Sequence, residues 1–249
     1  MAMMNLNVLY EDNHIIVVDK AAGILSQKDS SGVPSLLDCV KDYIKKKYNK
    51  SGNVFLGLVH RLDKPVSGIM VFARTSKAAQ RLGMEFAGRH VVKMYIALIE
   101  RRKPLVQGKW VERKDTLIRK RGYSELAGES GRGAKSATMK YLVISSNDAY
   151  SLILINIMTG RKHQIRTQLA AMDMPIVGDV KYGSSHVLTD NSICLHSIYL
   201  NFEHPTKKIP VEVFSTIPDR MSKKIKIDDA LWQTIKHTIR MQANKLKSQ

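Results

Sequence analysis

The sequence predicts an α+β fold with a mixed, mostly antiparallel sheet core and flanking helices. Strand-length apolar runs recur along the chain, and several are joined to the next run by a short polar turn, which is the pattern of antiparallel hairpins. Helical segments are inserted among these runs, but strands and helices do not alternate regularly as they do in parallel α/β folds. The 249 residues, 44% of them hydrophobic, are enough to bury a sizeable core.

The N-terminal third of the chain predicts three strands and two helices. The expected elements are a hairpin over residues 8–19, a helix over 36–48, a strand over 69–72 and a helix that runs through residue 87. In the first helix, apolar side chains share one side and lysines the other. Thr75 or Ser76 can cap the second helix and Gly88 can end it.

The rest of the chain predicts further strands and one more internal helix. Strands are expected over residues 91–100, 139–144, 150–157, 193–202 and 210–214. A helix is expected to open at Thr159-Gly160 and to run through about Met172. Residues 101–121 hold nine basic residues and predict an exposed, irregular or edge region that could lie along phosphates. The Gly/Ser-rich residues 128–133 predict a flexible stretch.

The C-terminal residues 219–249 form a Lys-rich segment with Leu231, Ile235 and Ile239 at helical spacing. Such a helix can dock on the preceding domain or extend toward a partner. We therefore expect one domain over residues 1–218, followed by a basic helical extension over residues 219–249.

The charge of the chain points to a polyanionic partner. Forty Lys and Arg residues against 22 Asp and Glu give a formal charge of +18 and an isoelectric point near 9.9. This charge attracts nucleic acid and accelerates encounter with it. A charge that serves only solubility explains the composition equally well, so a nucleic-acid partner needs support from motifs.

Composition also excludes several classes of protein. No apolar run approaches the roughly 20 residues needed to cross a bilayer, and the N-terminus lacks the basic region and apolar core of a signal peptide. We expect a cytoplasmic protein with no membrane association. Cys39 and Cys194 lie far apart without a Cys-x-x-Cys pair or a His cluster, so neither a disulfide framework nor a metal site is expected.

The segment His60-Arg61-Leu62-Asp63 is the first candidate for chemistry. It follows the apolar residues 56–59 and precedes the hydrophobic strand at residues 69–72. An Asp on a turn at the end of a strand can project into a cleft, and Arg61 can contact phosphate or occupy the space left by an extruded base. A surface ion pair between Arg61 and Asp63 is the simpler interpretation, and the segment alone favours it.

Two further segments are candidates. Residues 159–166 can begin a helix whose amides and cations favour an anion. A solvated basic face explains Arg161 and Lys162 there, but it explains His163, Gln164 and Arg166 less well. In the expected strand over residues 91–100, Tyr95 lies on the face opposite the aliphatic set and could face a groove. For a single strand tyrosine, a structural role is the commoner one.

Taken together and in this order, these segments resemble the RluA branch of the pseudouridine synthases. The resemblance runs from about residue 6 to about residue 218. The matching segments are Ile15–Gly23, His60–Asp63 with Ser67-Gly68, Lys93–Tyr95, Gly160–Arg166, Pro175–Asp179, Tyr182-Gly183 and Leu195–Ser197. The departures are Asp19 in place of the usual Asn, Ala21 in place of Pro and Val66 in place of Thr. The S4-like RNA-binding module that precedes the catalytic domain in many relatives is not expected here.

The resemblance implies that residues 1–218 are a catalytic domain that converts uridine to pseudouridine in structured RNA, either ribosomal or transfer RNA. It assigns the reacting carboxylate to Asp63 and the guanidinium that keeps this carboxylate charged to Arg166. It assigns stacking on uracil to Tyr95, which is also a candidate base for the C5 proton. It implies neither cofactor nor metal, and we expect a monomer.

The expected substrate-binding residues are His60, Arg61, His163, Gln164 and Ile165, of which Arg61 would help hold the target nucleotide out of the stack. Two other functions compete with this one. A non-catalytic RNA-binding protein on the same fold predicts that the reacting set is broken, yet Asp63, Tyr95 and Arg166 are all present. A cationic hydrolase that uses Asp63 and His163 lacks a second carboxylate at recognisable spacing.

Overall fold

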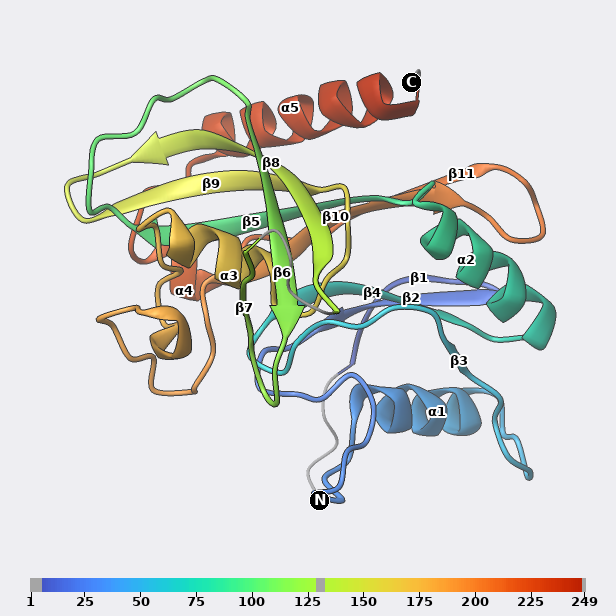
Figure 1. The fold of residues 1–249 in the computed structure, drawn as a ribbon. Helices are drawn as coiled ribbons and strands as arrows, with labels where there is room; N and C mark the ends of the chain where they lie inside the picture. Colours follow the sequence, from blue (N-terminus) through green and yellow to red (C-terminus); the bar gives the residue numbers. More distant parts are fainter. Residues whose placement is uncertain (1–5, 129–132, 248–249) are drawn as a thin grey trace. The chain divides into compact units, whose positions relative to one another are not determined.

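The computed structural model describes residues 6–128 and 133–247, and most of the predicted flexible stretch at 128–133 lies outside these ranges. The chain forms two compact units: unit 1, Met1–Val91 with Tyr199–Ser215, and unit 2, Val92–Ile198 with Thr216–Gln249. Figure 1 labels their helices and strands. The named strand pairs with a described register are all antiparallel. With helices packed on the strands, the predicted α+β class is confirmed.

Unit 1 is built around a hairpin and the strands added to it. β1 (Asn7–Glu11) pairs with β2 (Ile15–Lys20), as predicted, and β2 pairs on its other side with β4 (Ser67–Ala73). The two-residue β3 (Gly57–Leu58) also pairs with β4. Strand β10 (Leu195–Glu203) is divided between the units, and its Tyr199–Glu203 portion pairs with β11 (Pro210–Phe214) in unit 1.

The core of unit 1 follows from the period of two along its strands. Alternate residues of β2, β4 and β10 point to the same face of the sheet. That face carries Ile15, Val17, Ile69, Val71, Ala73, Leu200 and Phe202. Helix α2 (Ser76–Gly88) packs against it through Ala78 and Leu82, which are 1% and 0% exposed. A strand register shifted by one residue would turn these apolar side chains away from α2.

The ends of α2 confirm one expectation and correct another. Thr75 is the N-cap, and its side chain accepts a hydrogen bond from the Ala78 amide. The helix ends at Gly88, as predicted, but the residue that takes the left-handed conformation there is Arg89, at φ 63°, rather than the glycine. A Cβ at Gly88 would lie 2.8 Å from the ring of His90, an exposed side chain that can move aside.

Helix α1 (Leu36–Lys47) matches its prediction and begins with a capping box. The Ser35 side chain accepts from the Asp38 amide, while the Ser35 amide donates to the Asp38 carboxylate at 2.9 Å. Leu36, Val40 and Ile44 are the buried residues of the helix. Two of the first orphan amides of this helix, those of Ser35 and Asp38, are thereby satisfied by each other's side chains.

We expect Ser35→Ala to lower the free energy of unfolding by about 1 kcal/mol, because the substitution removes the N-cap acceptor. Urea unfolding followed by circular dichroism measures this change. Ser31→Ala, which alters an exposed serine in the preceding loop, is the control and should change stability by less than about 0.5 kcal/mol. Equal loss in both variants would contradict the role of the capping box.

Unit 2 holds a chain of antiparallel strands. β5 (Val92–Glu100) pairs with β9 (Tyr150–Ile157), β9 with β8 (Lys135–Ser146), β8 with β6 (Val111–Arg119) and β6 with β7 (Ser124–Leu126). The predicted β8–β9 hairpin is confirmed. Residues 101–110 are mostly exposed and irregular, as expected. Residues 111–119, however, form an inner strand, paired with β7 and β8, rather than an edge or a loop. Charged residues occupy both faces of this strand, with Glu112 and Lys114 on one and Arg113 and Asp115 on the other, so no apolar alternation marks it in the sequence.

The remaining elements of unit 2 are helical. They are α3 (Gln164–Ala171), the 3-10 turn η1 (Val180–Tyr182), α4 (Asp219–Ser222) and α5 (Asp229–Lys247). Helix α5 packs against β5 and buries Ile235 and Ile239 completely. Of the two alternatives for the basic tail, the structure therefore contains the docked helix. Within residues 6–128 and 133–247, no helix combines the length and apolarity that a bilayer span requires.

Buried in the unit 2 part of β10, His196 is 2% exposed. Burial and the positive charge of Arg220 lower its pKa from 6.5 to about 3. The folded protein therefore keeps this ring neutral over a pH range in which the unfolded chain protonates it. His196 contributes stability that is fully present above pH 6.5 and is lost as the pH falls toward 3.

Between about pH 7.5 and about pH 5, we expect the free energy of unfolding of the unmodified protein to fall by about 2 kcal/mol more than that of His196→Gln. Urea titrations of both proteins at the two pH values provide the measurement. Parallel pH dependence of the two proteins would show that His196 is not the group responsible.

Candidate active site

The residues singled out in the sequence are divided between the two units. His60, Arg61 and Asp63 belong to unit 1, while Tyr95 and residues 163–166 belong to unit 2. Each unit holds its candidate residues in place with polar contacts of its own.

In unit 1, the backbone on both sides of Asp63 is fixed by buried polar groups. The Ser26 hydroxyl donates to the Leu62 carbonyl at 2.7 Å and accepts from the Leu62 amide at 3.2 Å. The Lys20 ammonium, whose residue is 0% exposed, donates to the Lys64 carbonyl at 3.1 Å. The Asp63 carbonyl accepts from the Val66 amide at 3.1 Å. The turn that carries Asp63 is therefore held at every residue from 62 to 64.

Lys20 does more than contact this turn. Its ammonium also donates to the Ala21 and Ile24 carbonyls, at 3.1 and 2.8 Å. A buried cation requires such partners, so the end of β2 and the turn of Asp63 are locked together. The sequence contains one signal for this role, because a lysine ends a strand that begins with four apolar residues, immediately before the Ala21-Ala22-Gly23 break.

The neighbours of Asp63 differ in their surroundings. The His60 Nε2 accepts from the Val71 amide at 3.0 Å, and the imidazole stacks on Phe86 with ring centroids 4.6 Å apart. These contacts join the turn to β4 and α2 and give His60 a structural role. Arg61 is exposed. Substrate binding by either residue stays a prediction.

In unit 2, α3 begins at Gln164 rather than at Thr159-Gly160, so the predicted start of this helix is wrong. The Thr159 hydroxyl does not cap the helix but donates to the Gln164 Oε1 at 2.7 Å, and the Arg161 amide donates to the same oxygen at 3.1 Å. His163 then takes the left-handed conformation, at φ 54°, directly before the helix. The Gln164 side chain thus closes a turn over residues 159–163, and α3 begins only after this turn.

Gln164 and Ile165 are 4% and 6% exposed. Gln164 further donates from Nε2 to the Thr138 carbonyl at 3.1 Å, which ties the start of α3 to β8. The sequence pattern alone does not predict that Gln164 anchors α3 to β8. Substrate binding by Gln164 and Ile165 stays a prediction.

Arg166 is the most tightly held of the candidate residues of unit 2. Its Nε and Nη2 donate to the two carboxylate oxygens of Asp179, at 2.6 and 2.7 Å. Arg166 is 5% exposed and Asp179 is 1% exposed. The guanidinium also lies over the Tyr182 ring, 4.8 Å from its centroid. This two-point ion pair fixes the plane of the guanidinium as well as its position.

The Tyr182 hydroxyl joins the same arrangement to its surroundings. It lies 2.8 Å from the His163 Nδ1 and accepts from the Ser124 amide at 2.9 Å. Asp179 and Tyr182 were not predicted as site residues. Their signal was present in the matching segments around Pro175–Asp179 and Tyr182-Gly183, but no pairing with Arg166 could be derived from it.

Tyr95 lies in β5 opposite Ile155 of β9 and is 8% exposed. The predicted strand is confirmed. Both faces of β5 are buried, since Met94 and Ala97 are each 0% exposed, so burial along the strand does not distinguish the face of Tyr95 from the aliphatic face. Its role in the reaction stays a prediction.

Chemically, unit 2 offers a permanent and immobile positive charge. A guanidinium remains protonated at any physiological pH, and its burial against Asp179 and Tyr182 leaves it little freedom to turn. Such a group can hold an anionic partner in one orientation. In the part of the chain that the structure describes, no group of three or more His, Cys, Asp and Glu side chains is arranged to hold a metal ion.

Comparison with known proteins identifies the family of the chain. The family model for RNA pseudouridylate synthase matches residues 14–171. The chain is 31% identical to ribosomal large subunit pseudouridine synthase D of Xylella fastidiosa, over 86% of this chain and 66% of the relative. It is 28% identical to tRNA pseudouridine synthase C of Pasteurella multocida, over 91% of this chain and 97% of the relative.

A similar fold is found in human RNA pseudouridylate synthase domain containing 1, with a TM-score of 0.71 and 22% identity over 96% of both chains. The chain spans about two thirds of the length of the large-subunit relative, at 66%. Because the family match covers more than half of the sequence, the chain belongs to the RNA pseudouridylate synthase family. The resemblance inferred from its motifs is confirmed.

Asp179→Asn is expected to lower the free energy of unfolding by about 3 kcal/mol, because it removes the charge that compensates a buried guanidinium. Urea unfolding measures the loss. Asp173→Asn is the matched control, since Asp173 pairs with Arg102 through a side chain that is 60% exposed. Its effect should stay below about 1 kcal/mol. A similar small effect of Asp179→Asn would contradict the importance of the buried pair.

Proposed function

We propose that this protein isomerises uridine to pseudouridine in structured RNA. The observation that carries the proposal is the complete reacting set, Asp63, Tyr95 and Arg166, within the family match over residues 14–171. The relatives named above act on ribosomal and on transfer RNA according to their names, and both are proposed substrate classes for this chain.

The reaction exchanges one bond to the ribose for another. The bond between C1′ and N1 of uracil breaks, the base turns, and a bond from C1′ to C5 forms. The proton on C5 leaves and N1 gains one, so no oxidant or reductant is consumed. We propose that Asp63 supplies the ionised carboxylate at the nucleotide. Attack on C1′, attack on C6 and assistance of a glycal route are all compatible with a carboxylate in this role.

For the other two members of the set we propose supporting roles. Arg166 serves as the guanidinium partner of the reacting carboxylate, which is the role that the family resemblance assigns to it. The rigid hold of Asp179 and Tyr182 on Arg166 supports this role, since a fixed charge needs no reorganisation during the reaction. Tyr95 stacks on the uracil and is a candidate base for the C5 proton.

We further propose that basic segments bind the RNA backbone. These are residues 41–50, 101–121 and 219–249, which contribute much of the formal charge of +18. The target uridine is inaccessible inside a stacked helix, so it must be displaced. The exposed Arg61 is proposed to hold it in that position, with His60, His163, Gln164 and Ile165 as further substrate-binding residues. Structured loops with splayed bases are the expected targets.

The experiment is release of tritium from RNA labelled at C5 of uridine. We expect release by the unmodified protein and at least about a thousandfold slower release by Asp63→Asn, because the amide cannot replace the carboxylate. Asp148→Asn, in the exposed turn between β8 and β9, makes the same chemical change elsewhere and should retain activity. Equal release by Asp63→Asn and the unmodified protein, with both folded, would refute the role of Asp63.

A further inference from the structure

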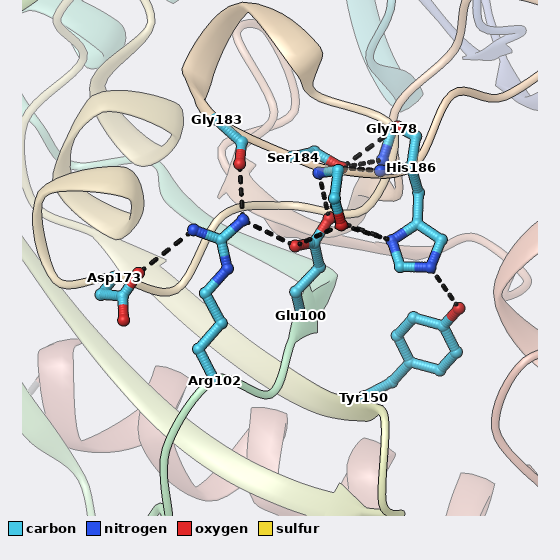
Figure 2. Close-up of polar contacts among 9 residues, drawn as sticks. Glu100, Arg102, Tyr150, Asp173, Gly178, Gly183, Ser184 and His186 are labelled. Atoms are coloured by element: carbon cyan, nitrogen blue, oxygen red, sulfur yellow. Dashed lines mark hydrogen bonds and ion pairs between the residues drawn. The ribbon is translucent and has the colours of Figure 1, made fainter.

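The loop that holds Arg166 is itself held by a buried carboxylate with no role in the proposed reaction. Residues 178–186 supply two partners of Arg166, the Asp179 carboxylate and the Tyr182 ring. Beside this loop lies Glu100, the last residue of β5, which is 5% exposed. Figure 2 shows its side chain directed at the loop.

Every polar neighbour of Glu100 for which a contact is described is a donor. Its Oε1 accepts from the Ser184 hydroxyl at 2.6 Å, the Ser185 amide at 2.8 Å and the His186 Nδ1 at 3.0 Å. Its Oε2 accepts from the Arg102 Nη2 at 2.8 Å and the Ser185 hydroxyl at 3.1 Å. A carboxylate is the side chain that can accept this many hydrogen bonds while donating none.

The ionised form of Glu100 is strongly favoured. Burial alone would raise its pKa, but hydrogen bonds from Ser184, His186 and Arg102 outweigh burial and lower the pKa to about 2. At neutral pH the loop of residues 178–186 is therefore bound by an ionised carboxylate. Hydrogen bonds to such a charged group are roughly twice as strong as those between neutral groups.

Ser184 connects the Glu100 carboxylate to the backbone on both sides of Asp179 through hydrogen bonds. Its hydroxyl proton goes to Glu100, so its oxygen accepts from the Gly178 amide at 3.1 Å and the His186 amide at 3.1 Å. The Ser184 amide donates to the Asp179 carbonyl at 3.1 Å. A continuous path of hydrogen bonds thus leads from the Glu100 carboxylate to the residue that pairs with Arg166.

Arg102 is a second side chain that holds the loop of residues 178–186. Its Nη2, already bound to Glu100, also donates to the Gly183 carbonyl at 2.6 Å, and its Nη1 reaches Asp173 at 3.2 Å. Figure 2 shows Arg102 between these groups. Gly183 and Ser184, which follow Tyr182 directly, are therefore anchored by Glu100 and by the arginine that Glu100 orients.

We propose that Glu100 is a positioning residue for Arg166. It holds residues 178–186 in the conformation in which Asp179 and Tyr182 engage the guanidinium together. The catalytic consequence rests on the role proposed for Arg166 above, while the structural consequence does not. A glutamine at position 100 cannot substitute, because its amide group would face Arg102, which offers donors alone.

The test compares Glu100→Gln with the unmodified protein by two measurements. The first is the solvent exchange rate of the Arg166 Nε proton in ¹⁵N-labelled protein, with the resonance assigned by its loss in Arg166→Lys. We expect exchange to accelerate about tenfold, since the loop opens more often once a charged hydrogen-bond network is lost. The second is tritium release, in which kcat should fall about tenfold or more while KM changes less than about twofold.

Glu203→Gln is the matched control, because it removes an exposed carboxylate that pairs with Lys208 at 2.7 Å. Both measurements should be unchanged in this variant. If Glu100→Gln does not fold, Ser184→Ala removes the path to Asp179 while Glu100 keeps its other donors, and the same two changes are expected.

The inference requires faster exchange in Glu100→Gln or, where that variant does not fold, in Ser184→Ala. An exchange rate within about twofold of the unmodified protein overturns it, even if the variant unfolds at a lower temperature, because Glu100 would then stabilise the fold without fixing Arg166. Unchanged kcat in an active enzyme overturns the catalytic consequence, whatever the exchange rate. If the unmodified protein releases no tritium from any RNA, the proposed function fails, and the exchange rate alone decides the role of Glu100.

Discussion

The buried ion pair between Arg166 and Asp179 is the interaction on which the candidate site of unit 2 depends. A guanidinium removed from water must be compensated nearby, or the fold pays a large desolvation cost. Asp179 meets this requirement with two hydrogen bonds of 2.6 and 2.7 Å. Because Asp179 lies in a loop, this solution works only if the loop is rigid. The contacts of Tyr182, Ser184 and Glu100 supply that rigidity.

Unit 1 uses the same physical device next to Asp63. Lys20 ends β2 as Glu100 ends β5, and each buried charge binds a neighbouring loop through several hydrogen bonds. The lysine binds carbonyl oxygens and the glutamate binds donors. In both units a charge at the end of a rigid strand fixes the loop that carries or supports a candidate residue. Such sites gain precision from the strand rather than from the loop itself.

The local elements were predictable where a short-range pattern determines them. The short apolar runs of β2, β4 and β9, and the capping residue Thr75, act within a few positions of one another. Prediction failed where a side chain had a competing partner. The Thr159 hydroxyl could have capped a helix, but the Gln164 side chain takes it, so α3 starts later. Charged residues on both faces of residues 111–119 hid a strand in the same way.

Two positions at which the chain departs from the family pattern also have partners that the sequence does not predict. Asp19 accepts a hydrogen bond from Ser215, and Val66 is 3% exposed and donates its amide to the Asp63 carbonyl. Neither partner could be identified from the motif, because the first contact joins residues far apart in the chain and the second uses only the backbone. Both contacts lie within unit 1.

The sequence by itself determined the fold class, the family and the set of candidate residues, because local patterns and motif spacing carry that information. Only the tertiary structure decided what holds these residues. Arg166 pairs with a residue 13 positions away, and Glu100 reaches Ser184 across 84 positions. Contacts over such separations are set by strand register and loop path, which no local pattern encodes. The family and its candidate residues were therefore readable from the chain, and the contacts that hold those residues were not.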